Sequence, residues 1–157
     1  MYQKLIIILL VLTQLNAIEC KQEVYTPALN NIPKTLDLLA KSAVTPQTLK
    51  SLQTVKVTKA HYFQDIKALE EKLTLLQEKK KAALKAKKFS EENVNIWNEL
   101  SSSCKGKDLI AAQKVQKDVN DIDRLISQRL STIEHYINMT QMGLDIGKKR
   151  YAPSISQ

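Results

Sequence analysis

Apolar residues recur at every third or fourth position along two long stretches of the chain. The first stripe comprises Leu52, Val55, Lys59, Tyr62, Ile66, Leu69, Leu73, Leu76, Lys80 and Ala83. The second stripe comprises Ala112, Val115, Val119, Ile122, Ile126, Arg129, Ile133, Ile137, Thr140 and Leu144. Alternating steps of three and four keep a stripe on one face of a helix wound against a partner. The pattern predicts two long helices, residues 46–88 and 108–144, packed as an antiparallel hairpin with Leu69 level with Ile126.

The connector between the two stripes carries a short apolar face of its own. Val94 and Trp97 lie on it, and Ser90 with the two glutamates after it is typical of a helix N-terminus. We therefore predict a separate short helix over 91–103, with Trp97 in the core. The lysines and arginine within the long stripes leave open edges, against which this helix can pack.

The segment before the first stripe is more irregular. Pro27 and the Asn30-Asn31 pair predict a non-helical stretch over 18–31, and Pro33 suits the first turn of a short helix over 33–43. The chain has only three Gly and four Pro. We therefore predict an all-α, three- to four-helix bundle.

The bundle domain is expected to cover residues 32–146, with a flexible basic tail over 147–157. Its core is expected to be mostly aliphatic, because aromatic residues make up only 5% of the chain.

The first seventeen residues have the composition of a secretory signal peptide. Lys4 precedes the apolar run 5–12, and the small residue Ala17 suits a signal peptidase. The run is far shorter than the roughly 20 residues that a membrane-spanning helix needs. Cleavage after Ala17 predicts a secreted protein with no transmembrane segment, whose mature chain begins at Ile18.

The two cysteines of the chain, Cys20 and Cys104, both remain after this cleavage. In an oxidising compartment two cysteines of one small chain usually pair with each other. We predict a Cys20–Cys104 disulfide; a bridge to another chain through Cys20, or two free thiols, are the alternatives. Such a bridge would carry the N-terminal segment back along the hairpin and over its open edge.

The chain is basic, with a formal charge of +8, and its densest charge is one lysine cluster. The cluster comprises Lys79, Lys80, Lys81, Lys85, Lys87 and Lys88. It could contact an anionic partner such as a sulfated glycan, an anionic membrane or an acidic protein. The alternative is a solvated end of the first long helix, where lysines complement the helix dipole.

Two short motifs concern covalent modification. Asn138-Met139-Thr140 is an N-glycosylation sequon, with Asn138 just off the second stripe. Gly147 with the three basic residues after it resembles a processing and amidation signal, and the alternative is a helix C-cap glycine before a basic tail.

No pattern in the sequence predicts catalysis. A Gly-rich phosphate loop, a GxSxG elbow and an HExxH motif are all missing from the sequence. The two histidines, His61 and His135, have no second His or Cys one helical turn away. We expect a non-enzyme without metal or other cofactor.

These observations favour a secreted helical protein that binds a macromolecule, an extracellular protein or an anionic surface, in an extracellular fluid. Nucleic acid is not expected, because aromatic residues do not interleave with the lysines. In outline the chain looks like the small cysteine-poor helical proteins of insect salivary or male accessory-gland secretions. The alternatives are a carrier of lipid or another apolar ligand, and a precursor processed at its basic tail. Weak self-association through the helices is also expected.

Overall fold

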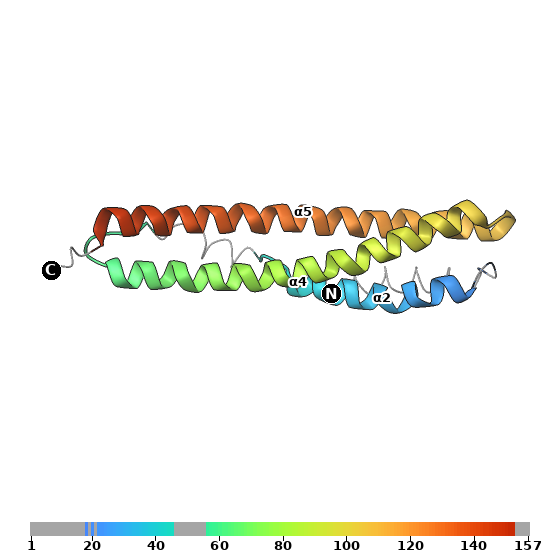
Figure 1. Ribbon diagram of the computed structural model, residues 1–157, viewed down its shortest axis with the longest axis horizontal. Helices are drawn as coiled ribbons and strands as arrows, with labels where there is room; N and C mark the ends of the chain where they lie inside the picture. The colour runs from blue at the N-terminus through green and yellow to red at the C-terminus, as the bar shows by residue number, and fades with distance from the viewer. Residues whose placement is uncertain (1–17, 19, 21, 46–55, 153–157) are drawn as a thin grey trace. The chain divides into compact units, whose positions relative to one another are not determined.

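The computed structural model describes residues 18, 20, 22–45 and 56–152. These residues form three helices and no strand: α2 (Gln22–Lys41), α4 (Tyr62–Ser103) and α5 (Gly106–Tyr151) (Figure 1). The predicted all-α class, with long packed helices, is confirmed. The predicted signal peptide, 1–17, lies outside the described residues.

The chain divides into two compact units. Of the described residues, those up to residue 41 and those from 82 to 128 form the first unit, and those from 42 to 81 and from 129 onward form the second. Helices α4 and α5 each pass through both units, whereas α2 belongs to the first unit only.

The second unit joins the first half of α4 to the last half of α5. One cluster of its core consists of Val57, Ile66, Leu69 and Leu144. Removing such aliphatic side chains from water contributes roughly 1.5–3 kcal/mol each. Three further side chains, those of Tyr62, Leu73 and Tyr151, are partly buried against this core.

Two ion pairs show how the helices run in the second unit. Glu70 of α4 pairs with Lys148 of α5, and Lys80 pairs with Glu134, each at 2.9 Å between nitrogen and oxygen. The later residue of α4 meets the earlier residue of α5. The two segments are therefore antiparallel within this unit.

The predicted pairing of Leu69 with Ile126 is wrong. A Cβ added to Gly143 would lie 3.8 Å from a methyl group of Leu69, so these two positions face each other. The predicted turn was placed too early, because α4 continues as far as Ser103.

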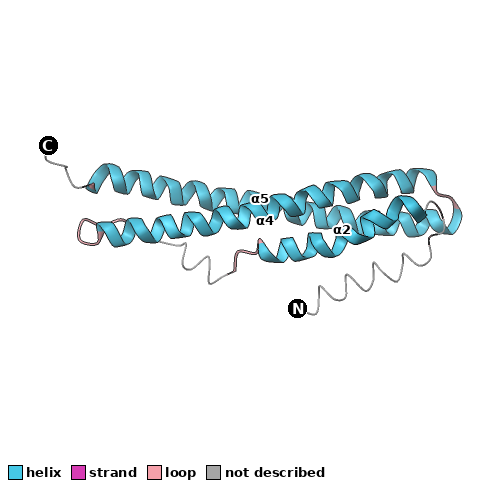
Figure 2. Cartoon of the chain, turned by 60° about the horizontal axis from the view of Figure 1, so that its bottom comes forward, coloured by secondary structure: helices cyan, strands magenta, loops and turns pink. Residues whose placement is uncertain are grey.

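The first unit contains α2, the last half of α4 and the first half of α5, and α2 lies beside α4 (Figures 1 and 2). Its fully buried side chains include the only tryptophan, Trp97, which confirms that residue as core. The second predicted stripe is confirmed in both units. Its buried members are Ala112, Val115, Val119, Ile122, Ile126, Ile133, Thr140 and Leu144.

Helix α2 corrects the predicted N-terminal region. The helix begins at Gln22 and ends at Lys41, so an irregular stretch over 18–31 is wrong from residue 22 onward, and the predicted 33–43 helix is only its second half. Both Pro27 and Pro33 lie inside it on exposed positions. Carbonyls that lose a helical bond to a proline can face water there.

An apolar stripe explains why α2 forms despite its two prolines. Tyr25, Ala28, Ile32 and Leu36 are all buried, at steps of three and four. The hydroxyl of Thr35, also buried, donates a hydrogen bond to the Asn31 carbonyl at 2.7 Å. The gain from burying this face outweighs the cost of the prolines.

Helix α4 also differs from the prediction. The predicted break before a separate 91–103 helix does not exist, because α4 runs unbroken from Tyr62 to Ser103. Ser90 lies in mid-helix, 2% exposed, and is not an N-cap. No Gly or Pro interrupts the segment, and its buried stripe continues through Ala86, Ser90, Asn93, Trp97 and Leu100.

The start of α4 is later than predicted. Residues 56–61 are not helical, and residues 46–55 lie outside the described part of the chain. The carboxylate of Asp65 accepts hydrogen bonds from the Thr58 backbone N–H at 2.9 Å and from its hydroxyl at 3.0 Å. These bonds, with one from the His61 N–H to the Thr58 hydroxyl at 3.3 Å, cap the helix at its first turn.

The turn between α4 and α5 carries the disulfide. Cys104 is bonded to Cys20, with Cα atoms 5.9 Å apart, so the predicted pairing is present in the structure. Gly106, at φ +59°, begins α5 in a left-handed conformation that favours glycine. The bridge ties the start of α2 to the end of α4 within the first unit.

The C-terminal region is more ordered than predicted. Helix α5 continues to Tyr151, so the flexible tail predicted from residue 147 is wrong as far as residue 151. Gly147 is buried against Val57, not a C-cap. Residues 153–157 lie outside the described ranges.

Candidate functional site

In the second unit, two lysines of the predicted cluster are engaged within the protein. The Lys79 ammonium donates to the backbone carbonyl of Ala43 at 2.6 Å, and Lys80 pairs with Glu134 at 2.9 Å. Lys81 is exposed. Lys79 and Lys80 therefore hold segments of the bundle together.

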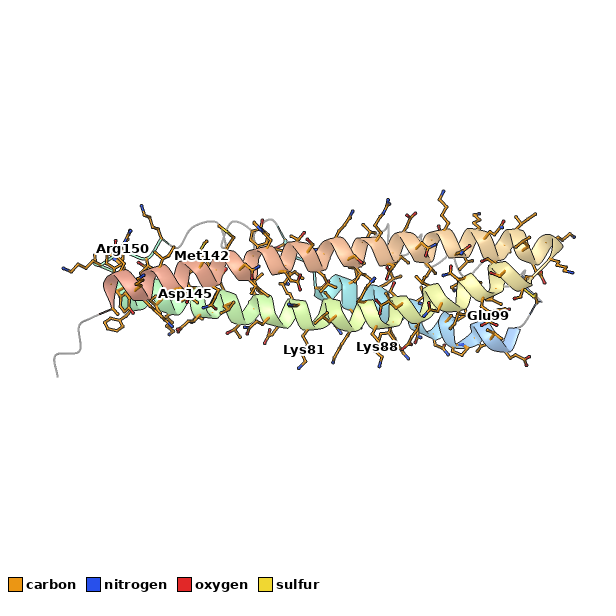
Figure 3. All side chains as sticks on the ribbon, turned by 45° about the horizontal axis from the view of Figure 1, so that its top comes forward. Lys81, Lys88, Glu99, Met142, Asp145 and Arg150 are labelled. Atoms are coloured by element: carbon orange, nitrogen blue, oxygen red, sulfur yellow. A yellow bond between two sulfur atoms is a disulfide. The ribbon has the colours of Figure 1, made fainter. Side chains whose placement is uncertain are left out.

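In the first unit, the cluster is divided in the same way. Lys87 donates to both carboxylate oxygens of Asp123, at 2.7 and 2.9 Å, and its nitrogen lies 3.6 Å from Glu91. Lys85 and Lys88 are exposed, and no described residue forms a hydrogen bond or ion pair with either. Figure 3 shows Lys88 pointing away from α4 into solvent.

These two free lysines border a groove between α2 and α4. The groove has a volume of about 440 Å³, within the range of small-ligand and side-chain pockets. We call it the Phe89 groove; it is lined by Lys34, Asp37, Leu38, Lys85, Lys88 and Phe89. Leu38 and Phe89 are half-buried and supply its apolar surface, whereas the lysines stand on both sides.

The groove is electrostatically positive. Its one acid, Asp37, is neutralised by Lys41 one turn along α2, at 2.7 Å. The Lys34 nitrogen lies 5.8 Å from the centre of the Phe89 ring, in the range of a cation–π contact. Three lysine charges are thus left for a ligand, beside an aromatic ring.

A catalytic or metal-binding role finds no support in the described residues. His61 and His135 are both exposed; His135 contacts the neighbouring Tyr136 ring edge-on. No group of three His, Cys, Asp or Glu side chains able to hold a metal occurs in the described ranges. The lysines of the Phe89 groove can attract and hold an anion.

The glycosylation sequon lies inside a continuous helix. Asn138 is exposed on α5, and Thr140 is 7% exposed and faces the core. The asparagine is accessible while the threonine is not, so use of the sequon stays a prediction.

The N-terminal end of the first unit is held by a polar clamp. The Tyr25 hydroxyl donates to the Ile18 carbonyl at 2.7 Å, and the Cys20 N–H donates to the Asp108 carboxylate at 2.8 Å. Burial, and secondarily the negative charge of Asp108, raises the pKa of Tyr25 above its ordinary value of 10.0. The phenol therefore stays neutral as a hydrogen-bond donor.

Three buried polar atoms of α4 lack a hydrogen-bond partner among the described residues. They are Ser90 Oγ, Asn93 Oδ1 and Trp97 Nε1, at spacings of three and four along one face. An unsatisfied buried polar group costs about 1–3 kcal/mol. This row weakens the core of the first unit locally.

Helix α5 has an exposed apolar strip in the second unit. Met139, Met142 and Ile146 are each about half exposed, one turn apart. Figure 3 shows Met142 on the outer side of α5. Self-association through such a face stays a prediction.

Sequence patterns alone did not reveal the Phe89 groove. Phe89 directly follows Lys88, so an aromatic residue beside the lysines was visible. Lys34 and Leu38 come from α2, and nothing in their local sequence shows that α2 packs next to this part of α4.

The structure defines an all-helical, disulfide-linked protein with a basic groove. Comparison of the chain with protein families, with curated proteins and with solved structures gives no match. Among the described helices, none is both long and apolar enough to cross a membrane.

Proposed function

We propose that this chain is a secreted, non-enzymatic protein that binds an acidic protein partner in an extracellular fluid through the Phe89 groove. The observation that carries this proposal is how the lysines are divided. Lys79, Lys80 and Lys87 are engaged with groups of the protein itself, whereas Lys85 and Lys88 are not.

The free lysines act together because they border one surface. Lys85 and Lys88 are less than one turn apart on α4, and Lys34 faces them from α2. Charges of one sign gathered at a concave surface raise the local concentration of an oppositely charged partner and speed its encounter.

The apolar surface of the groove favours a protein over a sulfated glycan as partner. Leu38 and Phe89 can bury an apolar side chain, which a protein offers and a sulfated glycan does not. Protein interfaces are enriched in aromatic side chains at their core and have polar side chains at their rim.

Secretion is supported by the signal-like residues 1–17 and is compatible with the Cys20–Cys104 bridge. Expression of the full chain in a secretory host checks both the secretion and the Cys20–Cys104 bridge. Mapping of unreduced peptides should give an N-terminus at Ile18 and one peptide linking the two cysteines.

Binding is tested with poly-glutamate as an acidic polypeptide probe, titrated by calorimetry into the secreted protein. We expect binding that weakens as salt rises, because exposed charges are screened over about 10 Å at 0.1 M salt. The triple variant Lys34→Gln, Lys85→Gln, Lys88→Gln should lose at least about tenfold in affinity, a loss of about 1.4 kcal/mol.

The matched control removes the same charge elsewhere in the first unit. Lys107, Lys114 and Lys117 are exposed on α5, and their joint change to Gln should leave binding nearly unchanged. Equal losses in both triple variants would show that net charge, not the groove, attracts poly-glutamate. Preferential binding of heparin at the groove lysines would replace the protein partner by a sulfated glycan.

A further inference from the structure

We infer that the Phe89 groove recognises an acidic peptide segment with one apolar side chain between its carboxylates. This inference rests on the proposed function and specifies the chemistry of the partner. It is based on the presence of both lysines and apolar side chains in one groove. Lysines alone would give no reason to expect an apolar side chain in the ligand.

The apolar surface of the groove is formed by Phe89 and Leu38, with lysines from both helices beside it. Phe89 and Leu38 are half-buried, so part of each remains available for contact. Lys34 stands on the α2 side, and Lys85 and Lys88 stand on the α4 side. A ligand in the groove therefore meets lysines of both helices beside the half-buried ring.

An ionic contact with Lys34 and an apolar contact with Phe89 would lie close together. The Lys34 nitrogen is 5.8 Å from the Phe89 ring centre. A carboxylate bound to Lys34 would thus lie beside the ring, and an apolar group that covers the ring must be close to that acid in the ligand. Burying apolar area here adds affinity that does not depend on salt.

An extended peptide provides this arrangement directly. Alternate side chains of an extended segment share a face, with a rise of about 3.3 Å per residue. In the peptide Glu-Glu-Phe-Glu-Glu, the phenylalanine and the two outer glutamates share one face. Each of these carboxylates is then offset by about 6.6 Å along the chain from the central ring, within reach of long lysine side chains.

The experiment compares three capped peptides on the unaltered secreted protein by calorimetry. They are Glu-Glu-Phe-Glu-Glu, Glu-Glu-Ser-Glu-Glu and Gln-Gln-Phe-Gln-Gln. We expect the first to bind about tenfold more tightly than either of the others, since it alone supplies both contacts. This comparison needs no variant and is independent of any effect of mutation on folding.

A substitution then assigns the preference to the groove. In the Phe89→Ala variant, the affinity for Glu-Glu-Phe-Glu-Glu should exceed that for Glu-Glu-Ser-Glu-Glu by less than about twofold, because the ring that the phenylalanine covers is gone. Phe63→Ala is the matched control, because Phe63 is 74% exposed and belongs to the second unit. Circular dichroism verifies that each variant keeps its helices.

The outcomes separate this inference from the proposed function. Equal binding of the two acidic peptides would overturn the inference and leave the proposed function standing. Binding of neither acidic peptide nor poly-glutamate would overturn both. Equal affinity for Gln-Gln-Phe-Gln-Gln and Glu-Glu-Phe-Glu-Glu would show an apolar site that does not select for charge. Displacement of the first peptide by lower concentrations of sodium laurate would assign the groove to a fatty-acid anion instead.

Discussion

The phenol ring of Tyr25 stacks on the indole ring of Trp97, with ring centres 5.8 Å apart and planes inclined by 22°. Both side chains are buried, at 3% and 0% exposure. An aromatic pair contributes about 0.5–1.5 kcal/mol beyond its buried area. This contact, together with the nearby disulfide, fixes α2 against α4. Helix α2 in turn forms one side of the Phe89 groove.

The disulfide is expected to be a large part of the stability of the first unit. Replacing Cys20 and Cys104 together by Ser removes a link between residues 84 positions apart. The chain-entropy relation predicts a loss of about 4–5 kcal/mol in the free energy of unfolding. Urea unfolding followed by circular dichroism measures this loss, and reduction of the unaltered protein should reproduce it. Unchanged stability would show that the packing of α2 is sufficient alone.

Two glycines of α5 are expected to respond oppositely to alanine. A Cβ on Gly147 would lie 2.5 Å from Val57 Cγ2, whereas one on Gly143 would meet Leu69 at 3.8 Å, an ordinary contact. Gly143→Ala should stabilise by about 0.5–1 kcal/mol, since alanine favours helix. Gly147→Ala should destabilise by about 1–3 kcal/mol through overpacking.

Thermal unfolding of both variants checks this contrast. The double variant Gly147→Ala, Val57→Ala should lose less stability than the sum of the losses in the two single variants, because the clash involves the valine methyl groups. A stabilising Gly147→Ala would contradict the close approach of residue 57 to α5.

Ser90 is expected to be replaceable with a gain. Its hydroxyl oxygen is buried in mid-helix without a described partner, so Ser90→Ala removes an unsatisfied polar atom and raises helix propensity. The free energy of unfolding should rise by about 1 kcal/mol. Ser127→Ala on exposed α5 is the control, with a change within about 0.5 kcal/mol. A clear loss in Ser90→Ala would show that the hydroxyl has a bonding partner in solution.

The buried phenol of Tyr25 should make stability fall at high pH. Its pKa is raised above 10.0 by burial and then by Asp108, so the folded chain keeps a proton that the unfolded chain releases above pH 10. The unfolded state binds fewer protons there, and the free energy of unfolding decreases as pH rises. Urea unfolding at pH 8 and above pH 10 measures the effect.

A phenylalanine variant separates Tyr25 from the other groups that titrate at high pH. At pH 8, Tyr25→Phe should be about 1 kcal/mol less stable, because the bond to the Ile18 carbonyl is lost. Above pH 10 this difference should shrink. Tyr136→Phe is the control. The prediction is contradicted if the free energies of unfolding of Tyr25→Phe and of the unaltered protein differ by the same amount at both pH values.

Local periodicity was sufficient for the helices whose stripes are apolar. The steps from Ala112 to Leu144 and from Ile66 to Ala83 identified buried faces that the structure confirms. The same rule failed from Ser90 to Leu100, because polar Ser90 and Asn93 occupy core positions there and Ser90 was interpreted as a helix start. Prolines also led to the prediction of a non-helical stretch in the first half of α2, although the buried stripe from Tyr25 to Leu36 follows the same spacing.

The sequence by itself determined the all-helical class and the two long stripes, since each depends on neighbouring residues, and the count of two cysteines predicted their pairing. Only the tertiary structure decided that α4 passes through Ser90 and which lysines remain free. It also decided that Lys34 and Leu38 meet Phe89. These outcomes depend on contacts between distant segments, where the burial of a shared face outweighs local preferences for a turn, a cap or a break.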